Sequence, residues 1–341
     1  MGRAAPRFSS FIAMIVLVTG AGGFLGGHLC EVLAETGCSV RAMVRPGRPA
    51  PEIAGEAIET VEADLLDEPS LRRALRGADA LVHAAARTGY WSRQNDEQWR
   101  INVEGTTVLL RAAQKAKVER IVHVSSIATV GATREGKLRR ESDVWQGPDP
   151  NRMHYVLTKR EAEQRALAAA WAGMSVVVVN PCMLIGPPAG GGRPTGLIPL
   201  VAAGQRAWAP PGGVSVADVV DVARGTAAAL SHGRSGERYI LGGHNLTWIE
   251  LFRTIATVAE VKPVRCTLPL PLVRALTGAT ALLDIAGLAR PPWTPELLRT
   301  FGWKAFMDSG RARSELGYAF RPLEESIRRT LTAQGEPEAA P

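Results

Sequence analysis

The sequence predicts an α/β protein built on a doubly wound parallel sheet, followed by a smaller, mainly helical C-terminal region. Short apolar runs alternate with helical patterns over the first half of the chain. Several of these runs are apolar throughout, as is typical of strands covered on both faces of a parallel sheet. After Pro181 the alternation stops and glycine and proline accumulate. The chain therefore divides into a regular first half and a different second half.

The order of the predicted elements is that of a parallel sheet with crossover helices. The first-half strands are 14–18, 40–44, 58–62, 80–83, 121–125 and 176–179, with helices at 26–36, 70–75, 102–116 and 155–172. In the second half we expect a loop or flap over 185–196, helices over 219–230, 248–260 and 272–289, and a strand over 238–241.

A glycine-rich turn follows the first predicted strand and opens a helix. Glycines at 20, 23 and 26 let the backbone approach a pyrophosphate, and the helix N-terminus supplies free N–H donors. A tight turn with no ligand would use the same glycines, but the strand–turn–helix context favours dinucleotide binding. The first half is thus predicted to be a Rossmann domain.

The end of the second strand indicates which dinucleotide is bound. An NAD site usually has an acidic residue there for the ribose hydroxyls. This chain has Arg45, with Arg48 close behind, and no acid. A guanidinium suits a 2′-phosphate, so the sequence predicts that NADP(H) is preferred and leaves NAD(H) possible.

The domain boundaries follow from these patterns in a chain of 341 residues, long enough for about two domains. Residues 1–13 are expected to form a disordered extension. Residues 14–181 form the NADP-binding Rossmann domain. Residues 182–335 form mainly a substrate-binding region, with some return to the first domain.

Composition excludes several other classes of protein. The net charge of +7 comes from dispersed arginines rather than one basic face, which argues against nucleic-acid binding. The four cysteines are far apart, so we expect reduced thiols in a cytoplasmic protein and no metal site. No stretch reaches the roughly 20 apolar residues of a membrane span. The apolar segment 270–289 could line a pocket, an interface or a membrane surface.

Tyr155 and Lys159 form an i, i+4 pair that lies on one face of a predicted helix. A tyrosine has a pKa near 10, and a nearby ammonium favours the phenolate, lowering that pKa toward working pH. Ser125 and Ser126 end the strand over 121–125, at the sheet edge where ligands bind. A serine hydroxyl there can bind a carbonyl oxygen, so these side chains predict proton-transfer chemistry.

Several motifs occur in an order that resembles a known family. These are TGAGGFLG at the glycine turn, Asp64-Leu65, HAAA from His83, NVEGT from Asn102, VSSIATVG and YVLTK. Together they resemble the extended short-chain dehydrogenase/reductases of the NAD-dependent epimerase/dehydratase group. Within it, the chain is most similar to dihydroflavonol-4-reductase-like and hopanoid-associated sugar-epimerase-like proteins. The resemblance extends from Met14 to about Leu331.

This resemblance implies roles for particular residues. Ser126, Tyr155 and Lys159 would form the catalytic set, with Ser126 preferred to Ser125 because it lies five residues before Gly131. Asn102 would support the active-site helix. The cofactor would be bound by Thr19, Gly20, Gly23, Phe24, Leu25, Arg45, Asp64, Leu65, Ala84, Ala85, Ala86, Tyr155, Lys159, Pro181, Met183 and Leu184.

Departures from the family narrow the reaction. The sugar-nucleotide dehydratases carry an Asp-Glu pair directly after the catalytic hydroxyl, where this chain has Ile127-Ala128. Dehydratase chemistry is therefore not expected. Epimerases usually hold NAD permanently through an acid after the second strand, and Arg45 argues against that arrangement.

Aromatic and methionine residues in the family's substrate regions suggest an apolar or ring-containing substrate. The candidates are Tyr90, Trp91, Trp145 and Met183, although core packing would use the same residue types. Arg193 and Arg206 could instead bind a phosphate, which keeps a nucleotide sugar open. The family often dimerises through two helices, here 102–116 and 155–171, so a homodimer is expected.

Three functions follow. The first is an NADP(H)-dependent ketone reductase or secondary-alcohol dehydrogenase for a hydrophobic small molecule. The second is a nucleotide-sugar epimerase with tightly bound NAD. The third, a cofactor-sensing regulatory protein, fits less well because such proteins often lack the Tyr–Lys pair.

Overall fold

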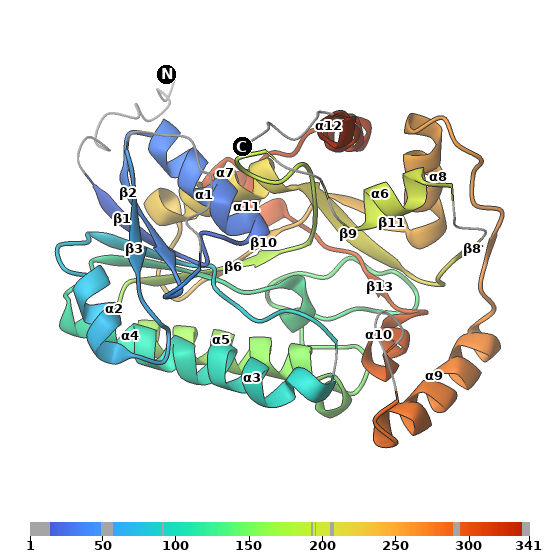
Figure 1. Cartoon of the computed structure of the whole chain (residues 1–341), viewed down its shortest axis with the longest axis horizontal. Coiled ribbons are helices and arrows are strands. Elements are labelled where there is room, and N and C mark those ends of the chain that lie inside the picture. The colour runs from blue at the N-terminus through green and yellow to red at the C-terminus, as the bar shows by residue number, and fades with distance from the viewer. Residues whose placement is uncertain are drawn as a thin grey trace.

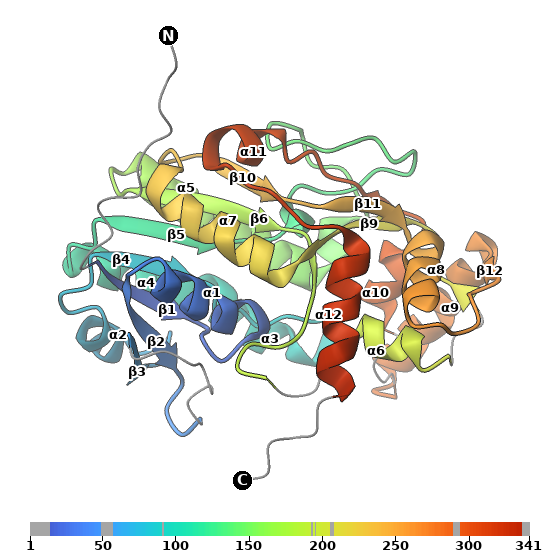
Figure 2. The same ribbon diagram turned by 90° about the horizontal axis from the view of Figure 1, so that it is seen from above.

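The computed structural model describes residues 14–48, 57–90, 92–191, 194, 196–204, 208–288 and 294–335. The extension predicted over 1–13 lies outside these residues. A central sheet separates two layers of helices, and a second group of short strands and helices adjoins one end (Figures 1 and 2).

Seven parallel strands form the central sheet in the order β10-β6-β5-β4-β1-β2-β3. They are β1 (Ile15–Thr19), β2 (Ser39–Val44), β3 (Ile58–Glu62), β4 (Ala80–His83), β5 (Arg120–Val124), β6 (Val176–Pro181) and β10 (Arg238–Leu241). The chain begins in the middle, builds outward to β3, and then returns to the other side of β1. The carboxyl ends of β1 and β4 therefore flank the topological switch point, where open α/β sheets bind ligands.

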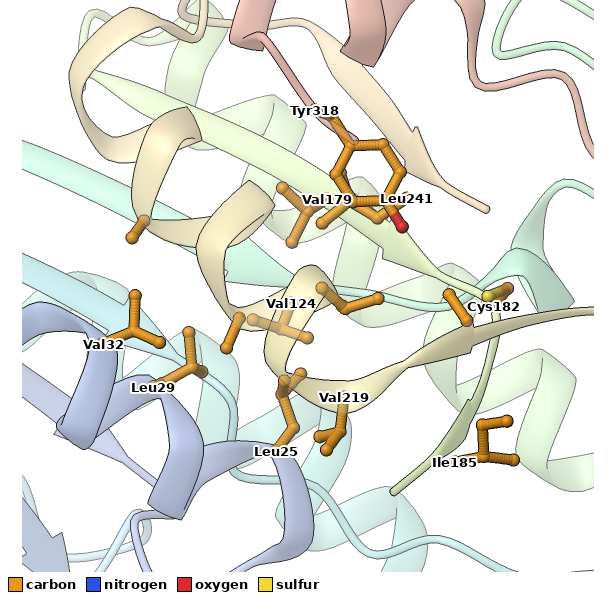
Figure 3. Packing of buried hydrophobic residues seen from close by; sticks show 14 of the residues in the cluster. Leu25, Leu29, Val32, Val124, Val179, Cys182, Ile185, Val219, Leu241 and Tyr318 are labelled. Atoms are coloured by element: carbon orange, nitrogen blue, oxygen red, sulfur yellow. The ribbon is translucent and has the colours of Figure 1, made fainter. Parts of the chain in front are cut away.

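Each face of this sheet is covered by helices because its strands are apolar on both sides. One face carries α1 (Phe24–Glu35) and α7 (Val219–His232), which lie side by side. Figure 3 shows Leu25, Leu29 and Val32 of α1 packed in one apolar cluster with Val219 of α7. The other face carries α2 (Glu68–Ala74), α4 (Gly105–Lys115) and α5 (His154–Trp171).

The first half agrees closely with the predicted elements. The strands over 58–62, 80–83 and 238–241 have the predicted bounds, and the other four differ by at most two residues at either end. The predicted helix over 102–116 is interrupted at its start, since residues 100–104 form one π-helical segment before α4. Such segments are frequent at functional sites.

The C-terminal region contains helices together with short strands that the sequence did not predict. The helices are α6 (Leu197–Ala202), α8 (Trp248–Val258), α9 (Leu270–Ile285), α10 (Pro295–Thr300), α11 (Gly310–Leu316) and α12 (Leu323–Gly335). The strands β7 (Met183–Ile185), β9 (Gly213–Asp218), β11 (His244–Thr247) and β13 (Lys304–Ala305) form one mixed sheet. A second small sheet pairs β8 (Trp208–Ala209) with β12 (Cys266–Thr267). Both α7 and β10 return to the first domain.

In the part of the chain that the structure describes, no helix is long and apolar enough to cross a membrane. Within the same ranges, no group of three or more potential ligand side chains is placed to hold a metal ion. All four cysteines are free thiols, of which Cys30, Cys38 and Cys182 are buried.

Candidate active site

A cavity of about 700 Å³ opens at the carboxyl ends of β1 to β4. The loops that follow these four strands supply most of its lining. The lining residues are Gly20, Gly22, Gly23, Met43, Val44, Arg45, Arg48, Asp64, Leu65, Leu66, Ala84, Ala85, Ala86, Arg87, Glu97, Arg100 and Ile101. It lies at the switch point, where the sequence predicted a dinucleotide.

The glycine-rich turn needs glycine at two positions for close backbone packing. Gly20 has a φ of +73°, and a Cβ there would lie 2.7 Å from the Cα of Ala85. A Cβ at Gly26 would lie 1.9 Å from the carbonyl oxygen of Gly20. A Cβ at Gly22 would meet no atom within 4 Å. The turn is therefore folded tightly against the end of β4 while Gly22 borders open space.

The turn leads directly into α1, which begins at Phe24. The first turn of a helix has N–H groups without intrahelical partners and carries the positive end of the helix dipole. These features suit the two phosphates of a dinucleotide. The residues present therefore fit the cofactor that the sequence predicts.

A buried chain of hydrogen bonds connects the turn to Asn102. The Oγ1 atom of Thr19 accepts from the N–H of Ala85 and lies 2.8 Å from Nδ1 of His83. His83 Nε2 lies 2.9 Å from Oγ1 of Thr106, whose hydroxyl donates to the carbonyl of Asn102. The Thr106 hydroxyl has a single proton, which it donates to the Asn102 carbonyl, so it must accept a hydrogen bond from His83 Nε2–H. His83 Nδ1 is then unprotonated and accepts from the Thr19 hydroxyl.

Burial keeps the histidine in this chain neutral. It lowers the pKa of His83 to about 3, with a further contribution from the charge of Lys159. A neutral imidazole donates at one nitrogen and accepts at the other, as the hydrogen bonds require. The predicted cofactor residue Thr19 is thus fully buried and faces this chain rather than the cavity.

Asn102 connects the loop after β4 to helix α5. Its Oδ1 accepts from the N–H of Arg87 at 2.7 Å, and its Nδ2 donates to the carbonyl of the same residue at 3.0 Å. Nδ2 also lies 3.2 Å from Oγ1 of Thr158, which is on α5. Asn102 therefore holds both segments, in agreement with a supporting role.

A second cavity, of about 430 Å³, contains the predicted catalytic hydroxyls. Ser126 and Tyr155 line it together with mostly apolar and aromatic residues. The remaining lining consists of Thr88, Gly89, Tyr90, Ile127, Ala128, Gly131, Ala132, Trp145, Pro148, Met153, Val156, Cys182, Met183, Gly213, Val214, Trp248, Leu297, Thr300, Trp303 and Ala305. Residues 84–87 line the first cavity and residues 88–90 line the second, so the same loop contributes to both cavities.

Tyr155 is positioned by its neighbours within this cavity. Its ring meets that of Tyr90 edge-on, with the centroids 5.5 Å apart. Burial raises the pKa of Tyr155, while a hydrogen bond with Ser126 acts in the opposite direction. Ser126 Oγ in turn accepts from the N–H of Ala128 at 3.1 Å. Both hydroxyls therefore belong to the same cavity wall.

Lys159 lies one turn further along α5 and is buried. Its Nζ donates to the carbonyl of Val124 at 2.8 Å, and burial lowers its pKa to about 8. The predicted lowering of the Tyr155 pKa is not present in this structure, because burial dominates and the ammonium is directed to Val124.

The two adjacent serines have different environments. The Ser125 hydroxyl donates to the buried carboxylate of Glu163 at 2.6 Å. The same carboxylate pairs with Arg238 at 2.9 Å and accepts from Asn180. Ser125 therefore belongs to the network of buried hydrogen bonds around Glu163, whereas Ser126 borders the second cavity. This contrast supports the choice of Ser126.

The predicted cofactor residues fall into two groups. Gly20, Gly23, Arg45, Asp64, Leu65, Ala84, Ala85 and Ala86 line the first cavity, whereas Tyr155 and Met183 line the second. Neither lining includes Thr19, Phe24, Leu25, Lys159, Pro181 or Leu184. Leu25 has its side chain in the core (Figure 3), so any contact it makes with phosphate would use backbone.

Of the four predicted substrate residues, Tyr90, Trp145 and Met183 line the second cavity. Trp91 lies outside the described residues, as do Arg193 and Arg206. The Trp145 indole donates to the carbonyl of Ala128 at 3.3 Å and lies against the guanidinium of Arg160.

Sequence reasoning missed several residues at both cavities. Arg87, Glu97 and Arg100 line the first cavity, and the Arg87 and Glu97 side chains pair at 3.3 Å. Trp248, Leu297, Thr300 and Trp303 line the second. These come from segments far apart in sequence, and no motif marks them.

Glu296 was also missed, and it lies at the start of the helix that carries Tyr155. Its buried carboxylate interacts with the backbone N–H groups of His154 and Tyr155, which lower its pKa, while burial raises the pKa more strongly. Glu296 thus places a carboxylate beside the N-terminus of α5 from the C-terminal region.

A phosphate-type turn at the switch point of a parallel sheet, next to a Ser–Tyr–Lys set, defines a dinucleotide-dependent oxidoreductase. Residues 16–242 match the model of the NAD dependent epimerase/dehydratase family. The chain belongs to this family and is an NAD(P)-dependent enzyme of the extended short-chain dehydrogenase/reductase type.

Similar proteins include a ketoreductase, a sterol demethylase protein and an epimerase. A 4-hydroxy-2-methyl-3-oxo-4-farnesyl-3,4-dihydroquinoline-1-oxide ketoreductase of Stigmatella aurantiaca is 31% identical over 90% of this chain and 92% of its own length. Sterol demethylase protein B of Methylococcus capsulatus is 30% identical over 89% of this chain and 93% of its own. The crystal structure of a nucleoside-diphosphate-sugar epimerase from Pseudomonas aeruginosa is 27% identical, with a TM-score of 0.76 over 94% of this chain and 97% of that one. The chain is similar to each of them.

Proposed function

We propose that the protein is an NADP(H)-dependent ketone reductase or secondary-alcohol dehydrogenase for a hydrophobic small molecule. The observation that carries the proposal is the second cavity. Its wall brings the hydroxyls of Ser126 and Tyr155 together among apolar and aromatic side chains. Such a lining suits a ketone with a large apolar frame and few polar groups.

Arg45 supports NADP(H) as the preferred dinucleotide. Both Arg45 and Arg48 line the first cavity just beyond β2 and are exposed to it. No acidic residue lies between Val44 and Arg48 to accept from the ribose hydroxyls. A guanidinium at this position would bind a 2′-phosphate by charge-assisted hydrogen bonds.

The dinucleotide, when bound, supplies or accepts the hydride at the carbonyl carbon. Ser126 and Tyr155 hold the carbonyl oxygen by hydrogen bonds, which polarises the carbonyl bond. As negative charge develops on that oxygen, Tyr155 donates its phenolic proton to it. Lys159, one helical turn away, supplies the positive charge that would stabilise the phenolate, once its ammonium turns from the Val124 carbonyl to which it donates in this structure. Oxidation of an alcohol uses the same groups in reverse.

The names of two relatives support an apolar substrate. One is named for the reduction of a ring ketone that carries a farnesyl chain, and the other for a sterol. In this chain Tyr90, Trp145 and Met183 would contact such a ring system. A terpenoid-, steroid-, polyketide- or flavonoid-like ketone would suit this lining.

A nucleotide-sugar epimerase is the second candidate, because the structurally similar Pseudomonas protein carries that name. An epimerase oxidises and re-reduces one carbon with the same cofactor molecule, so its cofactor stays bound. A reductase must release its cofactor after each turnover. The two candidates therefore differ in cofactor exchange.

Calorimetric titration of cofactor-stripped protein with NADPH and NADH separates the two candidates. We expect tight NADPH binding, weak NADH binding and no nicotinamide absorbance in protein as purified. Retained NAD, or NADH that binds as tightly as NADPH, would contradict the proposed role of Arg45 and favour the epimerase.

Replacing Tyr155 by Phe tests the proton donor. Once a panel of hydrophobic ketones has identified a substrate, we expect Y155F to lower kcat by about 10²–10⁴-fold, the usual contribution of general acid catalysis. NADPH affinity serves as the control and should change little. Turnover within a few fold of wild type would show that Tyr155 is not the donor.

We also propose a cytoplasmic homodimer. Helices α4 and α5 pack side by side on one face of the molecule, where they could form a four-helix bundle with a second copy. Measurement of the molecular mass in solution tests this assembly.

A further inference from the structure

Helix α9 (Leu270–Ile285) presents an unusual amount of apolar surface to solvent. Of its sixteen residues only Val273 is buried. Leu272, Leu276, Leu282, Leu283 and Ile285 are between 38% and 86% exposed, and Leu288 just beyond is also exposed. Figure 1 shows the helix at one end of the molecule, attached to the remainder mainly through α10.

The exposed apolar residues form one continuous stripe. Leu272, Ala275, Leu276, Ala279, Leu282 and Leu283 recur at helical spacing on the side that faces away from the protein. None of these positions is charged. The body-facing side carries Val273, which packs against Leu298 and Phe301. The helix is therefore anchored on one side and apolar on the other.

The charged residues of α9 and of the segment that precedes it are mainly positive. Arg274 of α9 is exposed, and so are Lys262 and Arg265 earlier in the chain. The single acidic residue in 262–288 is Asp284, and its carboxylate accepts from the Ser92 hydroxyl at 2.7 Å, on the side toward the body. An apolar helix face with a basic residue on the polar side is typical of helices that lie at the surface of an anionic bilayer.

The stripe is too small to form a stable protein interface by itself. A helix of this length measures about 24 Å and presents a width of about 10 Å. It would bury roughly 250 Å² per partner, whereas a stable interface buries about 800 Å² per partner. A bilayer surface needs no such minimum area. We propose that α9 docks the protein onto the surface of an anionic lipid bilayer.

Docking through α9 would also bring the second cavity close to the lipid. Leu297 and Thr300 of α10 line that cavity, and α10 packs against α9. At its other end α9 is held by Ser92, and Gly287 accepts a hydrogen bond from Arg93. These two residues follow soon after Tyr90, which lines the cavity. If the proposed reductase function holds, an apolar substrate could enter from the membrane beside α9.

Co-sedimentation of the full chain with lipid vesicles tests the docking. The vesicles are phosphatidylcholine alone or an equal mixture of phosphatidylcholine and phosphatidylglycerol, without substrate or cofactor. We expect binding to the mixed vesicles that is at least tenfold stronger than to the neutral ones. No sedimentation with the mixed vesicles would overturn the proposal.

A triple variant, L272S/L276S/L283S, should reduce binding to the mixed vesicles by at least tenfold. All three side chains are exposed, so the melting temperature should stay close to that of wild type. The matched control, L138S/V144S, changes two apolar side chains that are equally exposed but lie elsewhere. Binding that survives the triple variant, or is lost in the control, would overturn the assignment to α9.

The oligomeric state separates a membrane from a second copy of the chain. Sedimentation velocity of wild type and the triple variant should show the same mass. A dimer that the triple variant converts to monomer would show that α9 is a subunit interface, which contradicts the proposal. Vesicle binding is measured without turnover, so failure of the reductase function would leave this test intact.

Discussion

The two cavities of the site are built in different ways. The first takes most of its lining from short loops directly after β1, β2, β3 and β4. The second is lined from both domains, by segments as distant as 88–90, 126–132, 145–156 and 297–305. A cavity made of strand-end loops depends on backbone geometry, because the loops must approach closely. A cavity made of distant segments depends on how whole helices and strands pack against one another. Its lining side chains can therefore be replaced without changing the backbone, and such replacements would change which substrate fits.

We expect the largest effect on stability from a substitution at Gly26, which tests directly whether the first cavity depends on close backbone packing. We expect Gly26→Ala to destabilise the protein by roughly 3 kcal/mol, at the upper end of overpacking effects, because the new Cβ would meet the Gly20 carbonyl. Helix propensity alone would favour alanine by about 1 kcal/mol. Urea unfolding measures the change.

Gly22→Ala is the matched control for that variant. Its Cβ would meet no atom within 4 Å, so the free energy of unfolding should change by less than about 0.5 kcal/mol. Equal stability of the two alanine variants would show that the turn is not held by close packing.

Acid should weaken the core beneath both cavities. Burial lowers the pKa of His83 to about 3 and also places the pKa of His123 well below its usual value. Since the unfolded chain takes up these protons near pH 6.5, stability is complete above that pH and is lost as the pH falls. Protonation of His83 should reduce the free energy of unfolding by about 2 kcal/mol between pH 7 and pH 5, and His123 should act in the same direction.

His123→Leu isolates one of these contributions. Neither ring nitrogen of His123 has a hydrogen-bond partner, so leucine removes no bond. Urea unfolding at pH 7 and pH 5 should show less acid destabilisation than in wild type. His232→Gln, at the exposed end of α7, is the control and should keep the wild-type dependence. An unchanged acid dependence in His123→Leu would mean that His123 is protonated in the folded protein.

At the first cavity, the proposed preference for NADPH over NADH depends on the side chain of Arg45 and not on the backbone. We expect Arg45→Ala to weaken NADPH binding about tenfold or more, equivalent to at least about 1.4 kcal/mol, with little change for NADH. Calorimetry measures both affinities. Arg48→Ala should have a smaller effect, and the reverse order would transfer the phosphate contact to Arg48.

The smallest effect is expected at Glu296, which connects the C-terminal region to the helix of Tyr155. Glu296→Ala removes the carboxylate from beside the N–H groups of His154 and Tyr155, which should cost about 1 kcal/mol in urea unfolding. Glu296→Gln keeps an acceptor oxygen and should lose less. A larger loss in the glutamine variant would show that the interaction with the helix N-terminus requires the charge.

Much of the first half was determined by the sequence alone. Short β-type runs, several of them apolar throughout, predicted the seven strands of the central sheet, and the glycine turn predicted where the first cavity opens. The i, i+4 spacing placed Tyr155 and Lys159 on one face of α5. These features depend on short stretches of chain, whose backbone geometry is largely local. The family and its cofactor class follow from the same short motifs.

The features that the sequence did not predict were determined by the tertiary structure. It separated Ser126, at a cavity, from Ser125, which bonds Glu163. It also formed the strands β7, β9, β11 and β13, which pair across segments distant in the chain. It brought Glu296 to the start of α5 and left the apolar stripe of α9 exposed. Each of these outcomes depends on contacts between residues distant in the chain, which local patterns do not encode.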